Sequence, residues 1–488
     1  MTPRTLVVDV GTSSVRSSLV EPDGSVTSTR QVAVLPTTPS PGTVEVDADA
    51  IAAAVLSTAT AVLDEAGVVD AVGITNQRAT TIVWDADTGR PIGPGIGWQD
   101  LRTVIDCLTL QGEGLRLAPN ASATKLRWLV QHADPRLAAS GRLRFGTVDT
   151  WVAWVLSRGD LHVTDATNAG VTGLVSQDAA GWDTRALALL GLDDSLLPRI
   201  VDTMGVLGEA SALRGAPPIA AIVGDQQGSL AGQGCVAAGQ GKCTFGTGGM
   251  LDVVLGERPA FARQGHAGCF PIVARRHRGT ATWGLEAVML TAGSCVEWLR
   301  DDLCLIDRAE DTDALAASVP DSGGVTFVPA LLGIGTPDWD FGARGGFFGL
   351  TRGASKAHLV RAVLEGIAQR AADLVESAET DGGISLGTLR VDGGMTANAT
   401  FVQLLADATG RAIEVATVRE ATTRGAGLLA FVGVGTLRDT SAIGATWRPS
   451  RTVEPTFDED RRVAARATWT RSKAQALRAI PGLSDVTF

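Results

Sequence analysis

The sequence contains no tyrosine, and its histidines and cysteines are few and scattered. The six cysteines include no Cys-x-x-Cys pair, and the five histidines show no ligand-like spacing. The cysteines are therefore expected to be small buried thiols in a reducing compartment, rather than a disulfide framework or a metal centre. Nothing in the sequence explains the lack of tyrosine beside eleven tryptophans.

A basic surface and membrane-length apolar runs are also missing. The formal net charge is −11 and no basic stripe appears, so nucleic acid and an anionic membrane are not expected partners. No apolar run reaches the length of a transmembrane helix, and the first residues enter a strand-like run almost at once. The expected location is therefore the cytoplasm.

The length and composition indicate a well-packed protein of more than one domain. The 488 residues exceed one ordinary core, with 45% hydrophobic and 19% charged residues. Length alone predicts two large domains, or roughly three. The 58 glycines are spread along the chain and often follow apolar runs, which indicates tight turns after strands.

The pattern of the first half predicts alternating strands and helices. Residues 5–9, 15–20 and 25–34 are expected to form three consecutive strands, the first two joined by a tight turn. Segment 50–66 has helical periodicity, with Asp49 placed to cap its start. A short buried strand is expected at 71–74, and helices at 122–132 and 147–156.

The second half opens like the first. VVDVGTSS at 7–14 and CTFGTGGM at 243–250 are both strands that run into Gly-Thr and small residues, which indicates duplication. The boundary between two lobes is then expected near residues 235–242. Further helices are predicted at 284–301, 358–380, 397–409, 423–434 and 458–479, and a strand at 388–391.

One apolar run ends abruptly on polar residues. Residues 219–223 stop at Gly224-Asp225-Gln226-Gln227. In an open α/β sheet, ligands lie just beyond the carboxyl ends of strands, so Asp225 is a candidate functional carboxylate. The residues alone leave open a structural role, because Asp225 also precedes a predicted helix and is suited to cap it.

Three turns of small residues follow strands, at 9–14, 245–249 and 392–394. Glycines and hydroxyl residues let backbone N–H groups approach a phosphate closely, and Asp9 in the first turn is suited to Mg²⁺. Each turn alone is also explained as an ordinary β-turn. Together, the three turns favour a nucleoside triphosphate held between two lobes.

Ten stretches between the N-terminus and about residue 435 carry a family resemblance. In chain order they are DVGTSSVR, GITNQRATTIVWDADTGRPIGPGIGWQDLRT, KLRWLVQH, FGTVDTWVAWVL, VTDATNAG, GDQQGSLAGQ, FGTGG, GGFFGLTRGASKAHLVRAVLEGIA, VDGGMTAN and VREATTRGAG. With these stretches in the family's order, the chain resembles the FGGY carbohydrate kinases, and within that family it is most similar to the glycerol kinases. The resemblance implies an α/β fold of two actin-like (ribonuclease-H-like) lobes around a cleft, with a substrate lobe at 1–238, a nucleotide lobe at 239–440 and a helical tail at 441–488.

The resemblance implies phosphoryl transfer from MgATP to a hydroxyl of a small polyol or sugar. Asp225 would then be the catalytic base that accepts the proton of the attacking hydroxyl, and Asp9 and Asp225 would hold or orient Mg²⁺. Glu297 departs from the glutamine that glycerol kinases usually carry at this place near the nucleotide. The residues implied to bind ATP are Thr12, Ser13, Arg16, Thr247, Gly293, Glu297, Gly394 and Asn398.

The implied substrate pocket departs from that of the glycerol kinases. Ala79 replaces a glutamate, Asn120 a tyrosine and Met250 a phenylalanine, while Arg78 and Trp98 match the family. The lost carboxylate and the added space favour a longer polyol or a ketose, such as a tetritol, a pentitol, ribulose or xylulose. Glycerol stays the first expectation, because waters could fill the gap. The residues expected to line the substrate are Arg78, Ala79, Trp98, Gln99, Asn120, Gln226 and Met250.

An ATP-binding protein without small-molecule kinase activity is the alternative that the resemblance in fold leaves open. Actin-like filament proteins and heat-shock chaperones share such lobes and bind ATP without phosphorylating a small molecule. The TNQR (75–78) and GWQD (97–100) stretches favour the kinase, since both line the expected pocket. Assembly as a homodimer or homotetramer follows from the resemblance. Inhibition by fructose bisphosphate is not expected, because Arg214 is the only basic residue of segment 207–219.

Overall fold

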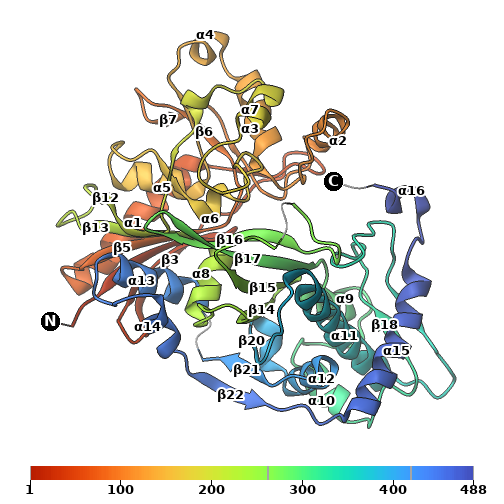
Figure 1. Cartoon of the computed structure of the whole chain (residues 1–488). Coiled ribbons are helices and arrows are strands. Elements are labelled where there is room, and N and C mark those ends of the chain that lie inside the picture. The colour runs from red at the N-terminus through yellow and green to blue at the C-terminus, as the bar shows by residue number, and fades with distance from the viewer. Residues whose placement is uncertain (1, 261–262, 418–419, 487–488) are drawn as a thin grey trace.

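The computed structural model describes residues 2–260, 263–417 and 420–486. Two large sheets form the centre of the molecule, and helices pack around them (Figure 1). The motif expected at 418–427 begins with Val418 and Arg419, which lie outside the described residues. Within the described ranges, no helix is both long enough and apolar enough to cross a membrane.

The first sheet has six strands in the order β12-β13-β5-β1-β2-β3. β1, β2 and β3 form an antiparallel meander, and β5 and β13 continue the sheet parallel to β1. The three carboxyl ends of β1, β5 and β13 therefore meet at one edge. The strands are β1 (Thr5–Val10), β2 (Ser14–Val20), β3 (Val26–Ala33), β5 (Ala71–Asn76), β12 (Met204–Glu209) and β13 (Pro218–Gly224).

The second sheet has seven strands in the order β16-β17-β15-β14-β20-β21-β22. Its core, β17-β15-β14-β20-β21, repeats the order and the strand directions of β3-β2-β1-β5-β13. The two sheets are thus copies of one topology, as the two similar hairpin sequences predict. The strands are β14 (Gly241–Phe245), β15 (Gly249–Gly256), β16 (Phe270–His277), β17 (Thr280–Met289), β20 (Leu389–Asp392), β21 (Ile413–Ala416) and β22 (Pro449–Val453).

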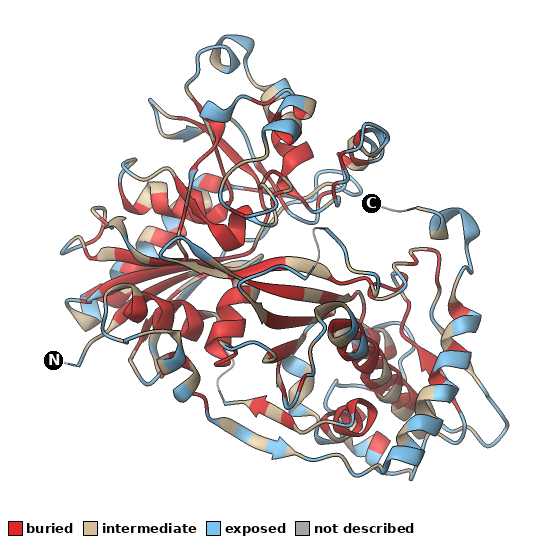
Figure 2. Ribbon diagram, viewed as in Figure 1, coloured by how far each residue is buried: buried red, intermediate tan, exposed pale blue. Residues whose placement is uncertain are grey.

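Helices cover both faces of the first sheet. Leu6 and Val8 of β1 point to a core with α1 (Ala48–Ala66) and α5 (Val148–Leu156), whereas Val7 packs with α13 (Ala421–Gly433) on the other face. On the second sheet, α9 (Gly293–Asp301), α11 (Lys356–Gly382) and α12 (Ala399–Thr409) cover one face. Figure 2 shows the buried residues concentrated in these strands and helices.

Two helices cross between the lobes. α8 (Asp225–Gly232) follows β13, and α13 comes from the second half of the chain yet packs on the first sheet. A Cβ at Gly232 would lie 1.8 Å from the Ala421 carbonyl oxygen, and one at Gly425 would lie 1.8 Å from the Gly228 carbonyl oxygen. Only glycine permits this approach, so the crossing is fixed by these residues.

A smaller subdomain lies at the top of Figure 1, between β5 and β12 in sequence. Its sheet, β7-β6-β9, packs with α3 and α7 around a separate hydrophobic core. Its elements are β6 (Ile82–Asp85), β7 (Arg90–Pro91), β8 (Gly95–Ile96), α2 (Val104–Gly112), α3 (Ser122–His132), α4 (Pro135–Ala138), β9 (Leu143–Gly146) and α7 (Thr184–Leu190). The remaining elements are β4 (Glu45–Val46), β10 (Val163–Asp165), α6 (Ala166–Ala169), β11 (Arg199–Val201), α10 (Asp311–Ala317), β18 (Thr326–Val328), β19 (Gly346–Phe348), α14 (Thr440–Ala445), α15 (Glu459–Ala476) and α16 (Pro481–Ser484).

The structure corrects three local predictions. The helix expected over 284–301 is wrong in its first part, because burial alternates there and Gly284–Met289 complete β17, so that α9 starts at Gly293. Asp47 caps α1 in place of Asp49, since its side chain accepts the Ala50 N–H. The tail expected to be helical also contributes β22 to the second sheet.

Candidate active site

The ends of three parallel strands position the first-lobe residues of the site. Asp9 on β1 and Val223 on β13 both pair with Thr75 of β5. Asp9 and Asp225 therefore lie at the same sheet edge, and Arg78 follows β5 between them. This is the edge where ligands of α/β sheets bind.

Asp225 is the first residue of α8, and Gly224 occupies the N-cap position. Its Oδ1 accepts the Gln226 N–H at 2.8 Å and lies 3.4 Å from Nε of Arg78, while 34% of the side chain stays exposed. Burial raises the pKa of Asp225, whereas Arg78 and the Gln226 bond oppose that rise. The carboxylate is thus accessible, oriented and more basic than a surface aspartate.

Asp9 lies among carboxylates with little compensating charge. It accepts a hydrogen bond from Thr423 at 3.0 Å, and Arg16, its cross-strand neighbour, is 3.9 Å away. Burial raises the pKa of Asp9 to about 6, and the charges of Asp225 and Glu420 add to that rise, although Arg16 and Thr423 oppose it.

The carboxylates of Asp9 and Asp225 fit Mg²⁺ that is bound to a nucleotide. Among the described residues, no three His, Cys, Asp or Glu side chains form a complete metal cage. Mg²⁺ usually takes one or two carboxylates and fills its other positions with water and phosphate oxygens. Asp9 and Asp225 supply that number, and a cation would relieve the repulsion between them.

Arg78 bridges the two lobes. Its Nη2 donates to Glu286 Oε2 on β17 at 2.6 Å, and its Nε faces Asp225. Its remaining nitrogen, Nη1, is buried without a hydrogen-bond partner among the described residues. Burial alone would lower the pKa of Arg78, but the charges of Glu286 and Asp225 raise it, so the guanidinium stays charged.

Lys242 is a second buried cation, close to the pair of Arg78 and Glu286. The Lys242 ammonium is 2.7 Å from Asp252, and it donates to Gln226 at 2.6 Å and to Thr244 at 3.0 Å. Both charged side chains are fully buried. Burial lowers the pKa of Lys242, but the carboxylates of Asp252 and Asp392 outweigh it and hold the pKa above its usual value. Gln226, next to Asp225, is therefore fixed from the second lobe.

The wall expected to bind substrate is held together by Lys125. Its Nζ donates to the carbonyl oxygens of Trp98 at 2.9 Å and Asn120 at 3.3 Å. Burial lowers the pKa of Lys125 to about 8. Ala79 has a left-handed backbone, with φ of 64°, and its carbonyl oxygen accepts a hydrogen bond from Ser122 at 2.8 Å.

The remaining expected pocket residues divide between the lobes. Trp98 and Gln99 are exposed, and the Trp98 indole lies 3.5 Å from the Thr12 hydroxyl. Met250 lies on the second sheet, two residues from Asp252 and on the same face. The structure thus brings Arg78, Asp225 and Gln226 together directly, while Ser122 and Lys125 hold the backbone of Ala79, Trp98 and Asn120.

The small-residue turn of the second lobe packs on the start of α9. The Gly293 N–H donates to Gly246 at 2.9 Å, and a Cβ at Gly293 would lie 2.5 Å from that carbonyl oxygen. This contact leaves Thr247 exposed at the tip of the turn, and Glu297 is exposed one turn further along α9.

The third turn also depends on a close approach. Gly393 has φ of 97°, and a Cβ there would lie 2.2 Å from the Phe245 carbonyl oxygen. Gly394 follows and is exposed. Asn398 uses both ends of its amide, accepting from Phe401 at 2.7 Å as the N-cap of α12 and donating to Thr312 at 3.0 Å.

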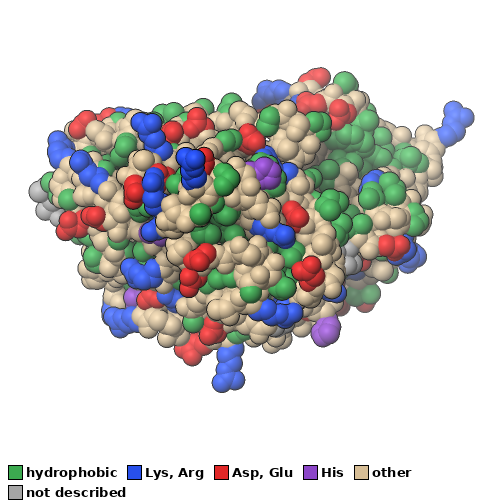
Figure 3. Space-filling model, turned by 90° about the horizontal axis from the view of Figure 1, so that it is seen from above, with side chains coloured by type: hydrophobic (Ala, Val, Ile, Leu, Met, Phe, Trp, Pro, Cys, Tyr) green, Lys and Arg blue, Asp and Glu red, His purple; other side chains and the backbone are tan. Residues whose placement is uncertain are grey.

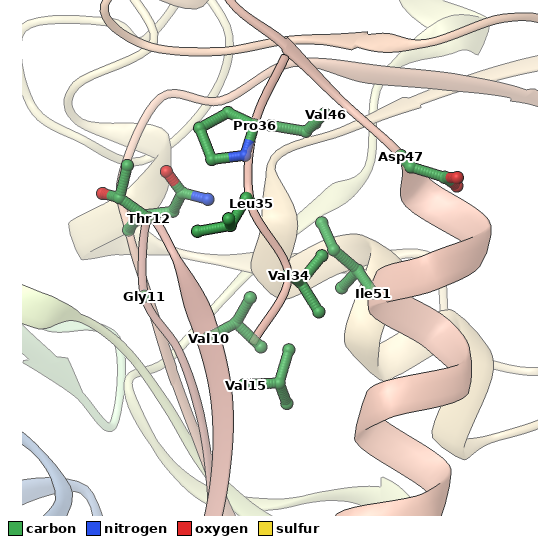
Figure 4. Close-up of a pocket in the computed structure, with 11 residues that line it drawn as sticks. Val10, Gly11, Thr12, Val15, Val34, Leu35, Pro36, Val46, Asp47 and Ile51 are labelled. Carbon is green, nitrogen blue, oxygen red and sulfur yellow. The ribbon is translucent and has the colours of Figure 1, made fainter. Parts of the chain in front are cut away.

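A small pocket lies behind the first-lobe turn (Figure 4). Gly11 and Thr12 form one side, and apolar side chains such as Val10, Val34 and Ile51 form the rest. Its volume of about 10 Å³ is enough for one water, so a polyol cannot bind in it. Thr12 and Ser13 are therefore candidates for phosphate contacts at the front of the turn only.

The surface carries mixed charge. On the face shown in Figure 3, basic and acidic side chains are interspersed, without a continuous basic area.

Four residues that bear on the charge of the site were not predicted from the sequence: Glu286, Lys242, Asp252 and Glu420. The one available signal for Glu286 was a single carboxylate in an otherwise apolar, alternating segment.

Family models match most of the chain. The N-terminal domain of the FGGY family of carbohydrate kinases matches residues 4–232, and the C-terminal domain of that family matches residues 241–434. The chain is 44% identical to the glycerol kinase of Aromatoleum aromaticum over 489 residues, covering 96% of this chain and 98% of that protein. It is 38% identical to the glycerol kinase of Petrotoga mobilis, with the same coverage of both chains.

Solved structures agree with this assignment. The glycerol kinase of Plasmodium falciparum with ADP has a TM-score of 0.91 and 28% identity, covering 98% of both chains. A ligand-bound xylulose kinase from Lactobacillus acidophilus has a TM-score of 0.87 at 21% identity, covering 98% of this chain and 99% of that one, and supports the fold alone. The expected α/β fold of two actin-like lobes and the family resemblance are confirmed. The chain belongs to the FGGY family of carbohydrate kinases and is an ATP-dependent kinase of that class.

Proposed function

We propose that this protein transfers the terminal phosphoryl group of ATP to a hydroxyl of a small polyol, with glycerol as the first candidate. The observation that carries the proposal is the accessible Asp225 carboxylate, set 3.4 Å from Arg78 at the edge where β1, β5 and β13 end. The names of the relatives favour glycerol.

Asp225 acts as the general base in this proposal. A base must reach the proton that it removes and have a pKa near the working pH. The carboxylate is exposed on one side, and burial raises its pKa, which makes it a stronger base than a surface aspartate. Arg78 and Gln226 hold the carboxylate in place and orient the acceptor beside it.

The phosphates would lie between the small-residue turns of the two lobes. Thr12, Ser13 and Arg16 would contact them from the first lobe, through backbone N–H groups, hydroxyls and one guanidinium. The proposed contacts from the second lobe are Thr247, Gly293, Glu297, Gly394 and Asn398. Because Asn398 already caps α12, its contact with the nucleotide requires a change of side-chain partner.

Asp9 and Asp225 would hold Mg²⁺, directly or through water. The bound ion would neutralise the charge that builds up between the β- and γ-phosphates during transfer. In its absence, Asp9 keeps a raised pKa and repels Asp225. Nucleotide and Mg²⁺ are therefore expected to bind together.

A longer polyol or a ketose is the second candidate for the acceptor. Ala79 leaves open the place where the resembling kinases carry a glutamate, and Asn120 and Met250 are smaller or more flexible than the aromatic residues expected there. Trp98, Gln99 and Asn120 would line the enlarged side.

The cytoplasmic location, the assembly of two or four copies and the lobe boundaries at 238 and 440 stay predictions.

ADP release measured with MgATP and a panel of acceptors tests the proposal. The panel contains glycerol, tetritols, pentitols, ribulose and xylulose, each over a range of concentrations. Saturable turnover that is highest with glycerol supports the first candidate, and a higher kcat/KM with another acceptor supports the second. Asp225→Asn should fold normally and lose transfer by about 100- to 10,000-fold; normal turnover would contradict the role of Asp225.

A further inference from the structure

Glu286 occupies an unusual place on the second sheet. Its neighbours Leu285 and Ala287 are fully buried in the hydrophobic core on one face of β17. Glu286 therefore points to the opposite face, where Asp252 is its cross-strand partner. That face carries Lys242 and lies toward the Arg78 side chain of the first lobe.

The hydrogen bonds of this cluster are incomplete. Nη2 of Arg78 donates a hydrogen bond to Oε2 of Glu286, and none of the described residues donates one to Oε1. On the Arg78 side, Nη1 is buried and unpaired. A buried donor without an acceptor costs about 1–3 kcal/mol, so it indicates a missing partner.

A single partner for both atoms has to accept a hydrogen bond from Nη1 of Arg78 and donate one to Oε1 of Glu286. A hydroxyl does both through one oxygen atom. Lys242 cannot replace it, because its ammonium is already bound by Asp252, Gln226 and Thr244.

We infer that Glu286 is a substrate-binding residue that, together with Arg78, clamps a hydroxyl of the polyol from the second lobe. The inference rests on the proposed function and deepens it. Ala79 provides no carboxylate beside Arg78, so Glu286 supplies from across the cleft the acceptor that position 79 lacks. The clamp forms only when both lobes are in contact.

The test compares glycerol with 1,2-propanediol and 1,3-propanediol, each of which lacks one hydroxyl. Wild-type enzyme should prefer glycerol over the analogue that lacks the clamped hydroxyl by about 10- to 100-fold in kcat/KM. Glu286→Gln should bring this ratio close to one, mainly by slowing glycerol. Glu286→Asp, which keeps the charge, should give an intermediate ratio.

Two further variants separate binding from general damage. Ala79→Glu combined with Glu286→Gln should restore at least a tenfold preference, because it returns a carboxylate beside Arg78. Glu379→Gln breaks an Arg–Glu pair of the same 2.6 Å length, with Arg411, and should leave the ratio unchanged. Melting temperatures of all variants report whether they fold.

The outcomes distinguish the clamp from the kinase activity itself. An active wild type together with an unchanged glycerol preference in folded Glu286→Gln overturns the role of Glu286 alone. An equal loss with all three acceptors also overturns it, because Glu286 would then only hold Arg78 in position. If the wild type phosphorylates no polyol of the panel, the proposed function fails, and the clamp fails with it.

Discussion

The buried pair of Lys242 and Asp252 allows a quantitative test of how the site is held. Both side chains have no exposed surface, and their charged atoms are 2.7 Å apart. Lys242→Met leaves the Asp252 carboxylate buried without its cation, and Asp252→Leu leaves the ammonium without its anion. Removing one partner of such a pair costs about 3–5 kcal/mol, because the remaining charge stays out of water.

The double variant Lys242→Met/Asp252→Leu should be far less destabilised than either single one. Neither charge of this pair is then left buried without its partner, and the expected loss is about 1 kcal/mol, for the hydrogen bonds to Gln226 and Thr244. The two substitutions should therefore show a coupling energy of several kcal/mol. Breaking the exposed pair of Arg300 and Asp301 should cost under about 1 kcal/mol and serves as the control.

Urea unfolding at pH 7, followed by fluorescence and by circular dichroism, measures these differences. Coincident transitions are needed first, because a chain of two lobes can unfold in steps. Single substitutions that cost under about 1 kcal/mol each, or a double variant that costs their sum, would refute the reasoning. The double variant should also stay at least about tenfold slower in kcat/KM, since Gln226 has lost its anchor while the fold has recovered.

Three further predictions concern packing, pH and regulation. Gly425→Ala should lower stability by about 3 kcal/mol or prevent folding, because its Cβ would lie 1.8 Å from a backbone oxygen of α8. Gly112→Ala is the control in a thermal melt and should be neutral, since its Cβ would meet no atom within 4 Å. Burial lowers the pKa of Lys125 from 10.5 to about 8, so the unfolded chain binds more protons between these values. Lys125 thus makes stability rise with pH in this window, so the urea midpoint of the wild type should rise relative to that of Lys125→Met. Fructose bisphosphate should not inhibit turnover, since Arg214 already donates to the Leu63 carbonyl oxygen.

The buried thiols oppose the effect of Lys125 in the alkaline window. Tyrosine, which titrates near pH 10, is absent, and lysine occurs only four times. Burial raises the pKa of Cys243 and Cys295, so these thiols lose their protons first in the unfolded chain, which lowers stability as the pH rises. Lys125→Met carries the same thiols, and its difference from the wild type therefore isolates the lysine. A slope that Lys125→Met does not change would contradict the buried, neutral state assigned to this lysine at high pH.

Local patterns were sufficient to predict the duplicated sheets. Each opening hairpin is an apolar strand that ends in Gly-Thr, and the strand order of the two sheets repeats as these hairpins indicate. The helix at 122–132 was also predicted with its observed bounds, because its periodicity is regular. Hairpins and regular helices depend on residues that are close in sequence, so their patterns can be recognised without knowledge of the tertiary contacts.

Contacts between distant segments were the part that could not be predicted. The apolar content of segment 284–301 suggested one long helix, and this hid Glu286, whose orientation depends on pairing with β15. In the same way, the apolar face of α13 predicts burial but not the sheet on which it packs. The pairing of Arg78 with Glu286 joins residues 208 positions apart, and no local pattern specifies it.

In the proposed acceptor site, Glu286 makes polyol binding depend on both lobes. Arg78 and Asp225 follow adjacent parallel strands of one sheet, so the first lobe alone sets their separation. Glu286 belongs to the second sheet, so its 2.6 Å contact with Arg78 would change if the lobes moved relative to one another. Opening the cleft would break the Arg78–Glu286 contact while Asp225 keeps its place. A polyol that needs both contacts is then held only when the lobes are closed, the state in which water is excluded from the phosphoryl group.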